Sequence, residues 1–316
     1  MPSTEKTFRD YTTDQGKTYA QNRLDYHPAL YNIIITHHTA TGGQLDTLID
    51  TGCGPGNVAA NLSQHFAHTI GLDPSEGMIG TARSLYTDVN GNDDDQEGKT
   101  KPNTLRFEVS TAEALGSNLS PPIAPSSVDL ITAATAAHWF DMPAFWRSAA
   151  RVLKPGGTVA IWGSGNLRVD PGAPNVAAIQ ARIDLFEAEL EPYFLPGNRM
   201  TRDLYRSLGL PWTVSPPIEG FDEKTFWRRD YETTDEFLAI KAPEVDLATF
   251  ERMLGTMSPV TRWREAHPGA VGTEEDVVRV FRRDVERLLE EVGVEDGKEK
   301  LKGSAQGFLL VVKKAS

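Results

Sequence analysis

The sequence has little of what marks oxidised, membrane-bound or nucleic-acid-binding proteins. A single cysteine, Cys53, excludes an internal disulfide bond, suits a reducing compartment and is best explained as a small packing residue. The formal net charge is −12, so no excess of lysine and arginine is available to neutralise nucleic-acid phosphates. No apolar run approaches the length of a transmembrane helix, and residues 1–6 lack the apolar core of a signal peptide. We therefore expect a cytoplasmic protein with a small-molecule or protein substrate and no membrane or nucleic-acid partner.

The most informative stretch that is present runs from Leu48 to Asn57. It has the pattern of a buried strand end, a glycine-rich turn and the start of a helix. Gly52, Gly54 and Gly56 are spaced by two residues, which allows a tight turn and close approach of a ligand to the backbone. We expect Asn57 to be the N-cap of the helix that follows. Such a turn at the carboxyl end of a first strand predicts a nucleotide-type site.

The spacing of the glycines distinguishes between two kinds of nucleotide. The dinucleotide fingerprint G-x-G-x-x-G would place its third glycine at position 57, where this chain has Asn57, so an oxidoreductase site is disfavoured. The pattern Asp50-x-Gly52-x-Gly54-x-Gly56 instead resembles the S-adenosylmethionine motif of the class I methyltransferases. The resemblance implies that S-adenosylmethionine is the cofactor and that this loop packs against its amino-acid end.

Further residues at the same end of the predicted sheet are candidates for cofactor binding. Asp73 ends the next strand, 21 positions after Gly52, and can bind a ribose in either kind of nucleotide site. Met78, at the start of the next helix, is placed to pack near a bound ring. Thr111 and Ala112 follow the third strand, where a loop would meet an adenine edge. Family members often carry an acidic residue at the place of Thr111, whose hydroxyl can still form a hydrogen bond.

Alternating strands and helices with short loops predict a right-handed, doubly wound parallel sheet. The chain therefore belongs to the α/β class, and with the resemblance we expect a Rossmann-like sheet of seven strands, mostly parallel. The last strand should be antiparallel at the edge of the sheet, after a helix that begins at Thr273 with a capping-box-like pair. The predicted units are an N-terminal cap segment (1–45), an S-adenosylmethionine-binding core (46–166), a mainly helical substrate lid (167–272), and a helix and strand that complete the core sheet (273–316).

Two other segments carry a more specific resemblance. The run Ala137-His138-Trp139-Phe140-Asp141 and the segment Pro196-Gly197-Asn198-Arg199 look like those of the fungal trans-aconitate methyltransferases. An N-terminal pattern of three residues is also similar to theirs, namely Tyr19, Arg23 and Tyr26. Met257-Ser258 stands where the family would have Trp-Ser.

The resemblance and the residue spacing together suggest roles near the cofactor and the substrate. Tyr19 and Arg23, four positions apart, can share a helix face and close over a cofactor carboxylate, or form a solvated face. Tyr26 and Trp139 are expected at the substrate.

The predicted chemistry depends on the methyl acceptor. A carboxylate is ionised at neutral pH and needs no general base, so catalysis would consist mainly of positioning and desolvation. A polycarboxylate would be held by arginines, of which Arg199 is the first candidate and Arg202 the second. The adjacent Arg228 and Arg229 are expected on a solvated face. No spacing of histidine and acidic residues resembles a metal site, so no metal is expected.

His138 has several possible roles. It can donate to a carboxylate, act as a base for a hydroxyl or thiol, or only form a wall of the pocket. The leading hypothesis is a methyltransferase for a small-molecule carboxylate such as trans-aconitate, acting as a monomer or homodimer. A second hypothesis changes the acceptor to a hydroxyl, thiol or amine of a secondary metabolite. A third is a cofactor-binding protein that has lost turnover.

Overall fold

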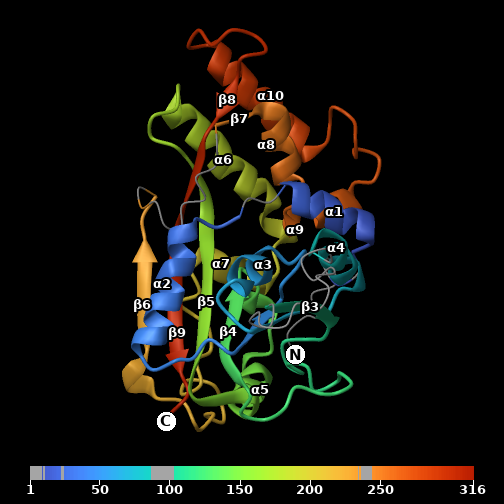
Figure 1. The fold of residues 1–316 in the computed structure, drawn as a ribbon. Coiled ribbons are helices and arrows are strands. Elements are labelled where there is room, and N and C mark those ends of the chain that lie inside the picture. The colour runs from blue at the N-terminus through green and yellow to red at the C-terminus, as the bar shows by residue number, and fades with distance from the viewer. Residues whose placement is uncertain (1–8, 10, 23–24, 87–102, 234, 236–243) are drawn as a thin grey trace, which may run out of the picture.

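The computed structural model describes residues 9, 11–22, 25–86, 103–233, 235 and 244–316. In this part of the chain, seven strands form one sheet in the order β3-β2-β1-β4-β5-β9-β6 (Figure 1). A separate pair, β7 and β8, lies in the helical part of the molecule. The strands are β1 (Thr47–Thr51), β2 (His68–Asp73), β3 (Thr104–Val109), β4 (Val128–Ala134), β5 (Leu153–Val169), β6 (Trp227–Tyr231), β7 (Val245–Asp246), β8 (Lys300–Leu301) and β9 (Gly303–Lys313).

The strand directions confirm the predicted fold class and correct the place of the last strand. Strands β1 to β5 are parallel neighbours, whereas β9 is antiparallel both to β5 and to β6. The prediction that the last strand lies at the edge was therefore wrong. Strand β9 lies between β5 and β6, and its residues 307–313 are all buried. The edge strand is β6, from the range predicted as lid, and its exposed Arg229 suits an edge, where charges oppose pairing with other chains.

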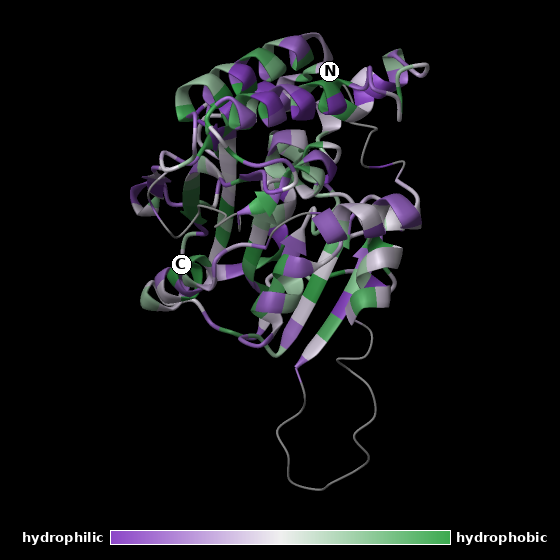
Figure 2. Cartoon of the chain, turned by 90° about the horizontal axis from the view of Figure 1, so that it is seen from above, coloured by the Kyte–Doolittle hydropathy of each residue, from purple (hydrophilic) through white to green (hydrophobic). Residues whose placement is uncertain are grey.

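Helices cover both faces of the sheet, as a doubly wound fold requires. Successive residues of a strand point to opposite faces. Thus Ile161 and Phe308 pack with α5 on one face, while Trp162 and Leu309 pack with α2 and α3 on the other. In the view from above, hydrophobic residues recur along the strands and helices among more polar ones (Figure 2). The helices are α1 (Thr13–Asn22), α2 (Pro28–Ala40), α3 (Asn57–Ser63), α4 (Glu76–Tyr86), α5 (Met142–Val152), α6 (Val176–Leu190), α7 (Pro196–Arg202), α8 (Leu247–Leu254), α9 (Ser258–Ala266) and α10 (Val277–Glu290).

A helical cap, formed by α6, α8, α9 and α10, stands at one end of the sheet and has its own apolar core (Figure 1). Phe281 of α10 is central to this core and lies 4.7 Å from the ring of Phe186 on α6. The long strands β5 and β9 reach from the sheet toward this cap. Residues 273–316 therefore do not all complete the sheet as predicted. The apolar stripe of α10 is buried in the cap, and only β9 joins the sheet.

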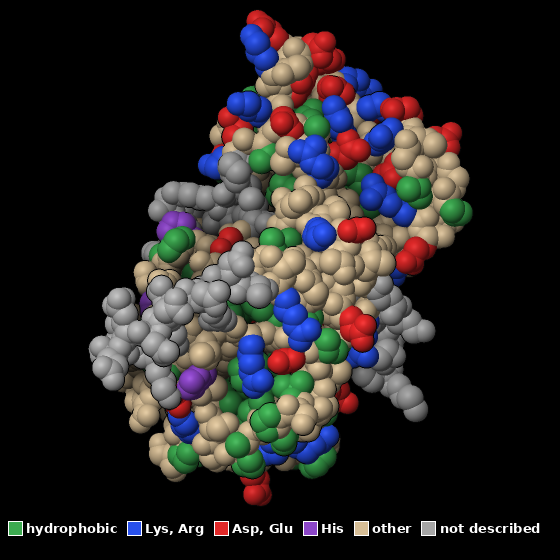
Figure 3. All heavy atoms as spheres, turned by 45° about the vertical axis from the view of Figure 1, so that its right-hand side comes forward, with side chains coloured by type: hydrophobic (Ala, Val, Ile, Leu, Met, Phe, Trp, Pro, Cys, Tyr) green, Lys and Arg blue, Asp and Glu red, His purple; other side chains and the backbone are tan. Residues whose placement is uncertain are grey.

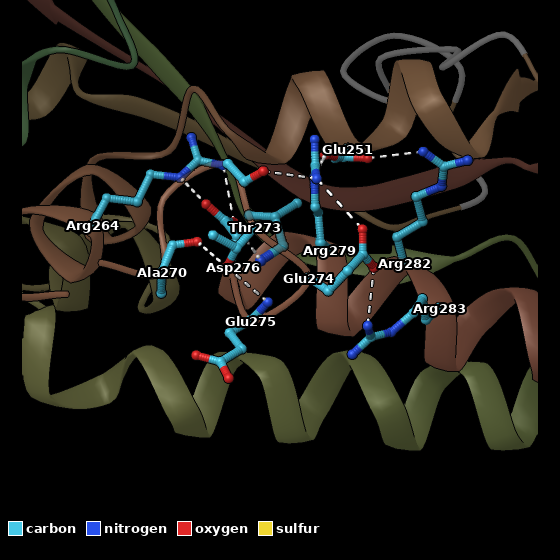
Figure 4. Close-up of polar contacts among 12 residues, drawn as sticks. Glu251, Arg264, Ala270, Thr273, Glu274, Glu275, Asp276, Arg279, Arg282 and Arg283 are labelled. Carbon is cyan, nitrogen blue, oxygen red and sulfur yellow. Dashed lines mark hydrogen bonds and ion pairs between the residues drawn. The ribbon is translucent and has the colours of Figure 1, made fainter. Parts of the chain in front are cut away.

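Ion pairs tie three helices of the cap together (Figure 4). Asp276 caps α10 by accepting from the amide of Val278 at 3.0 Å, and its carboxylate also accepts from Nε of Arg264 on α9 at 2.8 Å. The carboxylate of Glu251 on α8 lies 3.0 Å from the guanidinium of Arg282 on α10. Helix α10 thus begins after Asp276 and not at Thr273 as predicted, because the aspartate provides the cap.

The surface of the cap carries both signs of charge. In the space-filling view, lysine and arginine side chains are interspersed with aspartate and glutamate over this part of the molecule (Figure 3). Among the described helices, none has the length and apolar character needed to cross a membrane.

Candidate active site

The glycine loop joins β1 to α3 and leaves one open position. A Cβ at Gly56 would lie 2.6 Å from the ring of Phe107, and one at Gly52 would lie 2.6 Å from the Cβ of Ala136. Gly54 has a φ of +53°, yet a Cβ there would meet no heavy atom within 4 Å. Two glycines of the motif are therefore needed for packing within the protein, and the middle one leaves space for a ligand to approach the backbone.

The cap of α3 corrects one sequence prediction. The N-cap residue is Gly56 in a left-handed conformation, and the helix begins at Asn57. Gly56 has no side chain that could cap the first turn, so the cap predicted from Asn57 is absent.

Asp73 ties the glycine loop to the end of β2. One carboxylate oxygen accepts from the amide of Gly54 at 2.9 Å, and the other accepts from the amide of Ser75 at 2.9 Å. Burial raises the pKa of Asp73 to about 6, although both amides oppose the rise. Each oxygen still has lone-pair capacity, so the carboxylate can hold the loop and accept ribose hydroxyls together.

Asp50 is the other buried carboxylate of the motif. One oxygen accepts from the hydroxyl of Thr132 at 2.7 Å, whereas Oδ2 is buried without a hydrogen-bond partner among the described residues. Burial raises the pKa of Asp50 to about 7. A buried carboxylate oxygen without a donor is unusual in a folded protein. Asp50 stands near the end of β1, the strand that leads into the glycine loop, so its carboxylate fits a role in shaping the loop that would hold S-adenosylmethionine.

The raised pKa of Asp50 predicts a specific pH dependence of stability. An unfolded aspartate titrates near ~4, so between about pH 4 and pH 7 the folded chain holds a proton that the unfolded chain has released. The contribution of Asp50 to stability must then fall as pH rises through this window and level off above it. Asp50→Asn removes this titration, so we expect the Tm of the variant relative to wild type to increase between about pH 5 and pH 8 without cofactor. The exposed Glu290→Gln is the control, and a flat or falling difference for Asp50→Asn would contradict the assignment.

The remaining predicted cofactor residues lie around this loop. Met78 is buried at the start of α4, where its amide approaches the hydroxyl of Ser75 at 3.3 Å. Thr111 uses its hydroxyl to accept from the amide of Ala114, and Ala112 beside it is buried. Tyr19 lies on α1 and Arg23 lies outside the described residues. Their cofactor contacts stay predictions.

Helix α1 is held against the core close to α4. The hydroxyl of Thr81 donates to the carbonyl of Thr13 at 3.2 Å, and a Cβ at Gly77 would lie 2.0 Å from the carbonyl oxygen of Tyr11. Contacts between α1 and α8 also join this segment to the helical cap. The N-terminal segment therefore lies where it can cover the cofactor end of the core.

The end of β4 carries the second half of the site. Thr135 has a φ of +49°, which is unusual for a β-branched residue and marks a constrained backbone. Its amide donates to the carbonyl of Trp162 at 2.8 Å, and its hydroxyl lies 2.8 Å from the hydroxyl of Tyr26. Residues 137–139 then form a short 3₁₀ turn that carries His138 and Trp139 with their rings 4.4 Å apart.

The structure adds a residue that sequence reasoning missed. Tyr205 is buried, its ring lies 5.5 Å from that of His138, and its hydroxyl forms a hydrogen bond with Nδ1 of His138. No local pattern marks it, since 67 residues separate the two positions.

Helix α7 packs directly on the turn that carries His138. A Cβ at Gly197 would lie 2.6 Å from the indole of Trp139 and 2.8 Å from the carbonyl oxygen of His138. The side-chain amide of Asn198 donates to the hydroxyl of Ser258 at 3.1 Å, which joins α7 to α9. The two segments with the more specific resemblance therefore meet in space.

The candidate arginines on α7 already contact a carboxylate. Arg199 and Arg202 both form ion pairs with Glu191, and the Arg202 guanidinium also lies 4.0 Å from the centre of the Phe194 ring. The Arg199 side chain is 53% exposed and that of Arg202 is 26% exposed, so Arg199 is the more accessible of the two.

The adjacent arginines of β6 differ from each other. Arg229 is exposed as predicted, with its guanidinium 4.7 Å from the Tyr231 ring. Arg228 is not on a solvated face: it donates to the carbonyl of Leu204 at 2.6 Å and lies 5.1 Å from the Phe308 ring. The prediction for Arg228 was wrong because β6 places its guanidinium against the carbonyl of Leu204, in the turn that also contains Tyr205.

Comparison with known proteins agrees with this geometry. Residues 49–161 match the model of a methyltransferase domain, and this range contains the glycine loop, Asp73 and His138. This chain is an S-adenosylmethionine-dependent methyltransferase. A Dictyostelium discoideum protein named "Putative methyltransferase" is 28% identical over 222 residues, which cover 70% of this chain and 72% of that protein. The Aspergillus candidus methyltransferase cfoB is 33% identical over 162 residues, which cover 51% of this methyltransferase and about half, 46%, of that relative.

A solved structure supports the fold of the methyltransferase. It is described as a "Putative Type II Methyltransferase" from Anaeromyxobacter dehalogenans, with 22% identity and a TM-score of 0.56. The likeness covers 93% of this chain and 97% of that one. The names of these relatives specify no methyl acceptor, so the resemblance to trans-aconitate methyltransferases stays a prediction.

Proposed function

We propose that this methyltransferase methylates a carboxylate of a small polycarboxylic acid similar to trans-aconitate. The observation that supports this most is the contact of Gly197 with the turn that carries His138 and Trp139. This contact places the start of α7, the helix of Arg199 and Arg202, against the turn that follows β4. The two guanidinium groups pair with Glu191, so the proposal requires that Arg199 exchanges this partner for a substrate carboxylate.

In this proposal the protein acts by binding, orienting and excluding water. Asp50, Gly54 and Asp73 would hold S-adenosylmethionine, which supplies a methyl group on a sulfonium, a good leaving group. The acceptor carboxylate, with an ordinary pKa near ~4, is already ionised and needs no base. Arg199 would bind a distal carboxylate of the substrate and thereby align the reacting oxygen for in-line displacement.

The partner of Arg199 also supports the proposal. Its guanidinium lies 3.0 Å from a carboxylate oxygen of Glu191, which is itself 43% exposed. Exposed ion pairs of this kind contribute little to stability, so a substrate carboxylate can replace Glu191 at small cost. Arg199 would then bind a substrate carboxylate in the way in which it binds the carboxylate of Glu191.

The test is methyl transfer from radiolabelled cofactor to trans-aconitate, compared with a panel of phenols, thiols and amines. We expect base-labile label on trans-aconitate, as an ester requires. Arg199→Ala should raise the KM for trans-aconitate about 10- to 100-fold, because a charged hydrogen bond to the substrate is lost.

Arg168→Ala is a matched control for Arg199→Ala. Arg168 is 43% exposed and, within the described residues, pairs with Asp184 at 3.0 Å, so its removal should leave KM unchanged. An unchanged KM in Arg199→Ala would remove this residue from the substrate site, and absence of any label on carboxylic acids would overturn the proposed acceptor.

A second candidate acceptor is a hydroxyl, thiol or amine of a secondary metabolite. It is favoured by Met257, which replaces the expected tryptophan just before Ser258, the partner of Asn198 on α7. Met257 is adjacent to a residue that contacts α7, and α7 is the helix that we expect to select the substrate. Label that resists base and appears on a phenol, thiol or amine would favour this alternative.

A further inference from the structure

The turn that carries Tyr205 is built to hold one conformation. Leu204 and Tyr205 are consecutive residues with φ of 50° and 56°, a conformation that is unfavourable for residues other than glycine. Arg228 donates to the carbonyl of Leu204, and Arg206 forms an ion pair with Asp230 at 2.9 Å. Such strain persists where the surroundings fix it, and it is enriched at functional sites.

Packing places the Tyr205 ring against the site. The ring is 1% exposed and lies 4.6 Å from the ring of Phe308 on β9. Its hydroxyl forms a hydrogen bond with Nδ1 of His138. The phenol therefore contacts the imidazole through its polar end, while its ring is held by Phe308.

The burial of the Tyr205 phenol identifies the donor in its hydrogen bond with Nδ1 of His138. Burial raises the pKa of Tyr205 well above its ordinary value, so the phenol keeps its hydrogen. In the described part of the chain, Nδ1 of His138 is the acceptor within reach of that hydrogen. If Nδ1 carried its own hydrogen, it would donate to the phenol oxygen and the phenol hydrogen would be buried without an acceptor, which is costly.

We infer that Tyr205 is a positioning residue that donates to Nδ1 of His138 and keeps the proton of the neutral imidazole on Nε2. His138 can then donate a hydrogen bond from Nε2 but cannot accept a proton there. The inference rests on the proposed function and deepens it. An imidazole fixed as a donor suits an acceptor that is already an anion, whereas a hydroxyl acceptor would need Nε2 unprotonated.

The experiment measures the tautomer directly, from ¹H–¹⁵N long-range correlation spectra of the histidine side chains in the full-length protein. His138→Gln assigns the signals of His138. We expect a protonated Nε2 and an unprotonated Nδ1 in wild type, and a change of about tenfold or more in the tautomer ratio in Tyr205→Phe. Tyr231→Phe removes another buried phenol hydroxyl, on β6, and should leave the spectrum of His138 unchanged.

Activity gives a second readout. Tyr205→Phe should lower kcat/KM for trans-aconitate about tenfold, while the Kd for S-adenosylhomocysteine stays unchanged. A wild-type spectrum with the proton on Nδ1 would overturn the inference without any variant, and so would an unchanged tautomer ratio in Tyr205→Phe. If Nε2 is protonated but label appears only on hydroxyls, the proposed acceptor fails while the role of Tyr205 stands.

Discussion

Gly54→Ala is expected to weaken binding of S-adenosylhomocysteine about 10- to 100-fold while the protein stays folded. The added methyl meets no protein atom within 4 Å. The loss of folding stability is therefore only that of an alanine in the left-handed conformation, roughly 1–2 kcal/mol. The same methyl enters the space through which the cofactor would approach the loop. Crowding of a tight site by one methyl costs ~1–3 kcal/mol, which gives the stated loss of affinity. Isothermal titration calorimetry measures this Kd.

Gly42→Ala separates the backbone effect from the ligand effect. Gly42 also has a positive φ, +86°, and open space around its Cβ position, but it lies in the turn between α2 and β1. It should lose a similar amount of stability and bind S-adenosylhomocysteine with the wild-type Kd. Equal affinities of the two variants would show that the cofactor does not lie against Gly54.

The part of the site that could be predicted from the sequence is the part that local rules determine. The strand, turn and helix around Gly54 follow from a short apolar segment, glycines that allow positive φ and a helical period of four. Asp73 could be predicted by the same kind of local rule, because it is the last residue of a short apolar strand. Both lie at the carboxyl ends of parallel strands, so the topology alone places them together.

What could not be predicted depends on contacts between distant segments. The strand at residues 227–231 has two arginines and an aspartate, which indicate a solvated face, and its place in the sheet depends on pairing with β9. The contact of Tyr205 with His138 depends on a left-handed turn that no glycine marks. The ion pairs of Arg199 and Arg202 with Glu191 depend on how α7 follows α6, and the sequence pattern contains no signal for that angle.

Gly197→Ala is expected to lower kcat/KM about 10- to 100-fold while the Kd for S-adenosylhomocysteine stays unchanged. Its methyl would lie 2.6 Å from the indole of Trp139 and 2.8 Å from the carbonyl oxygen of His138, so either α7 or the 3₁₀ turn must move. A shift of one ångström between groups that orient a substrate is enough for a loss of this size.

Steady-state kinetics with trans-aconitate and calorimetry with S-adenosylhomocysteine separate the effect of Gly197→Ala on the acceptor side from any effect on the cofactor side. Gly269→Ala is the control, because Gly269 has no heavy atom within 4 Å of its Cβ position and no positive φ. Full activity of Gly197→Ala would show that the contact between α7 and the His138 turn is not needed for methyl transfer. A weaker Kd for S-adenosylhomocysteine would instead place α7 on the cofactor. The outcome therefore decides whether the two segments that resemble the trans-aconitate methyltransferases act together as one acceptor site.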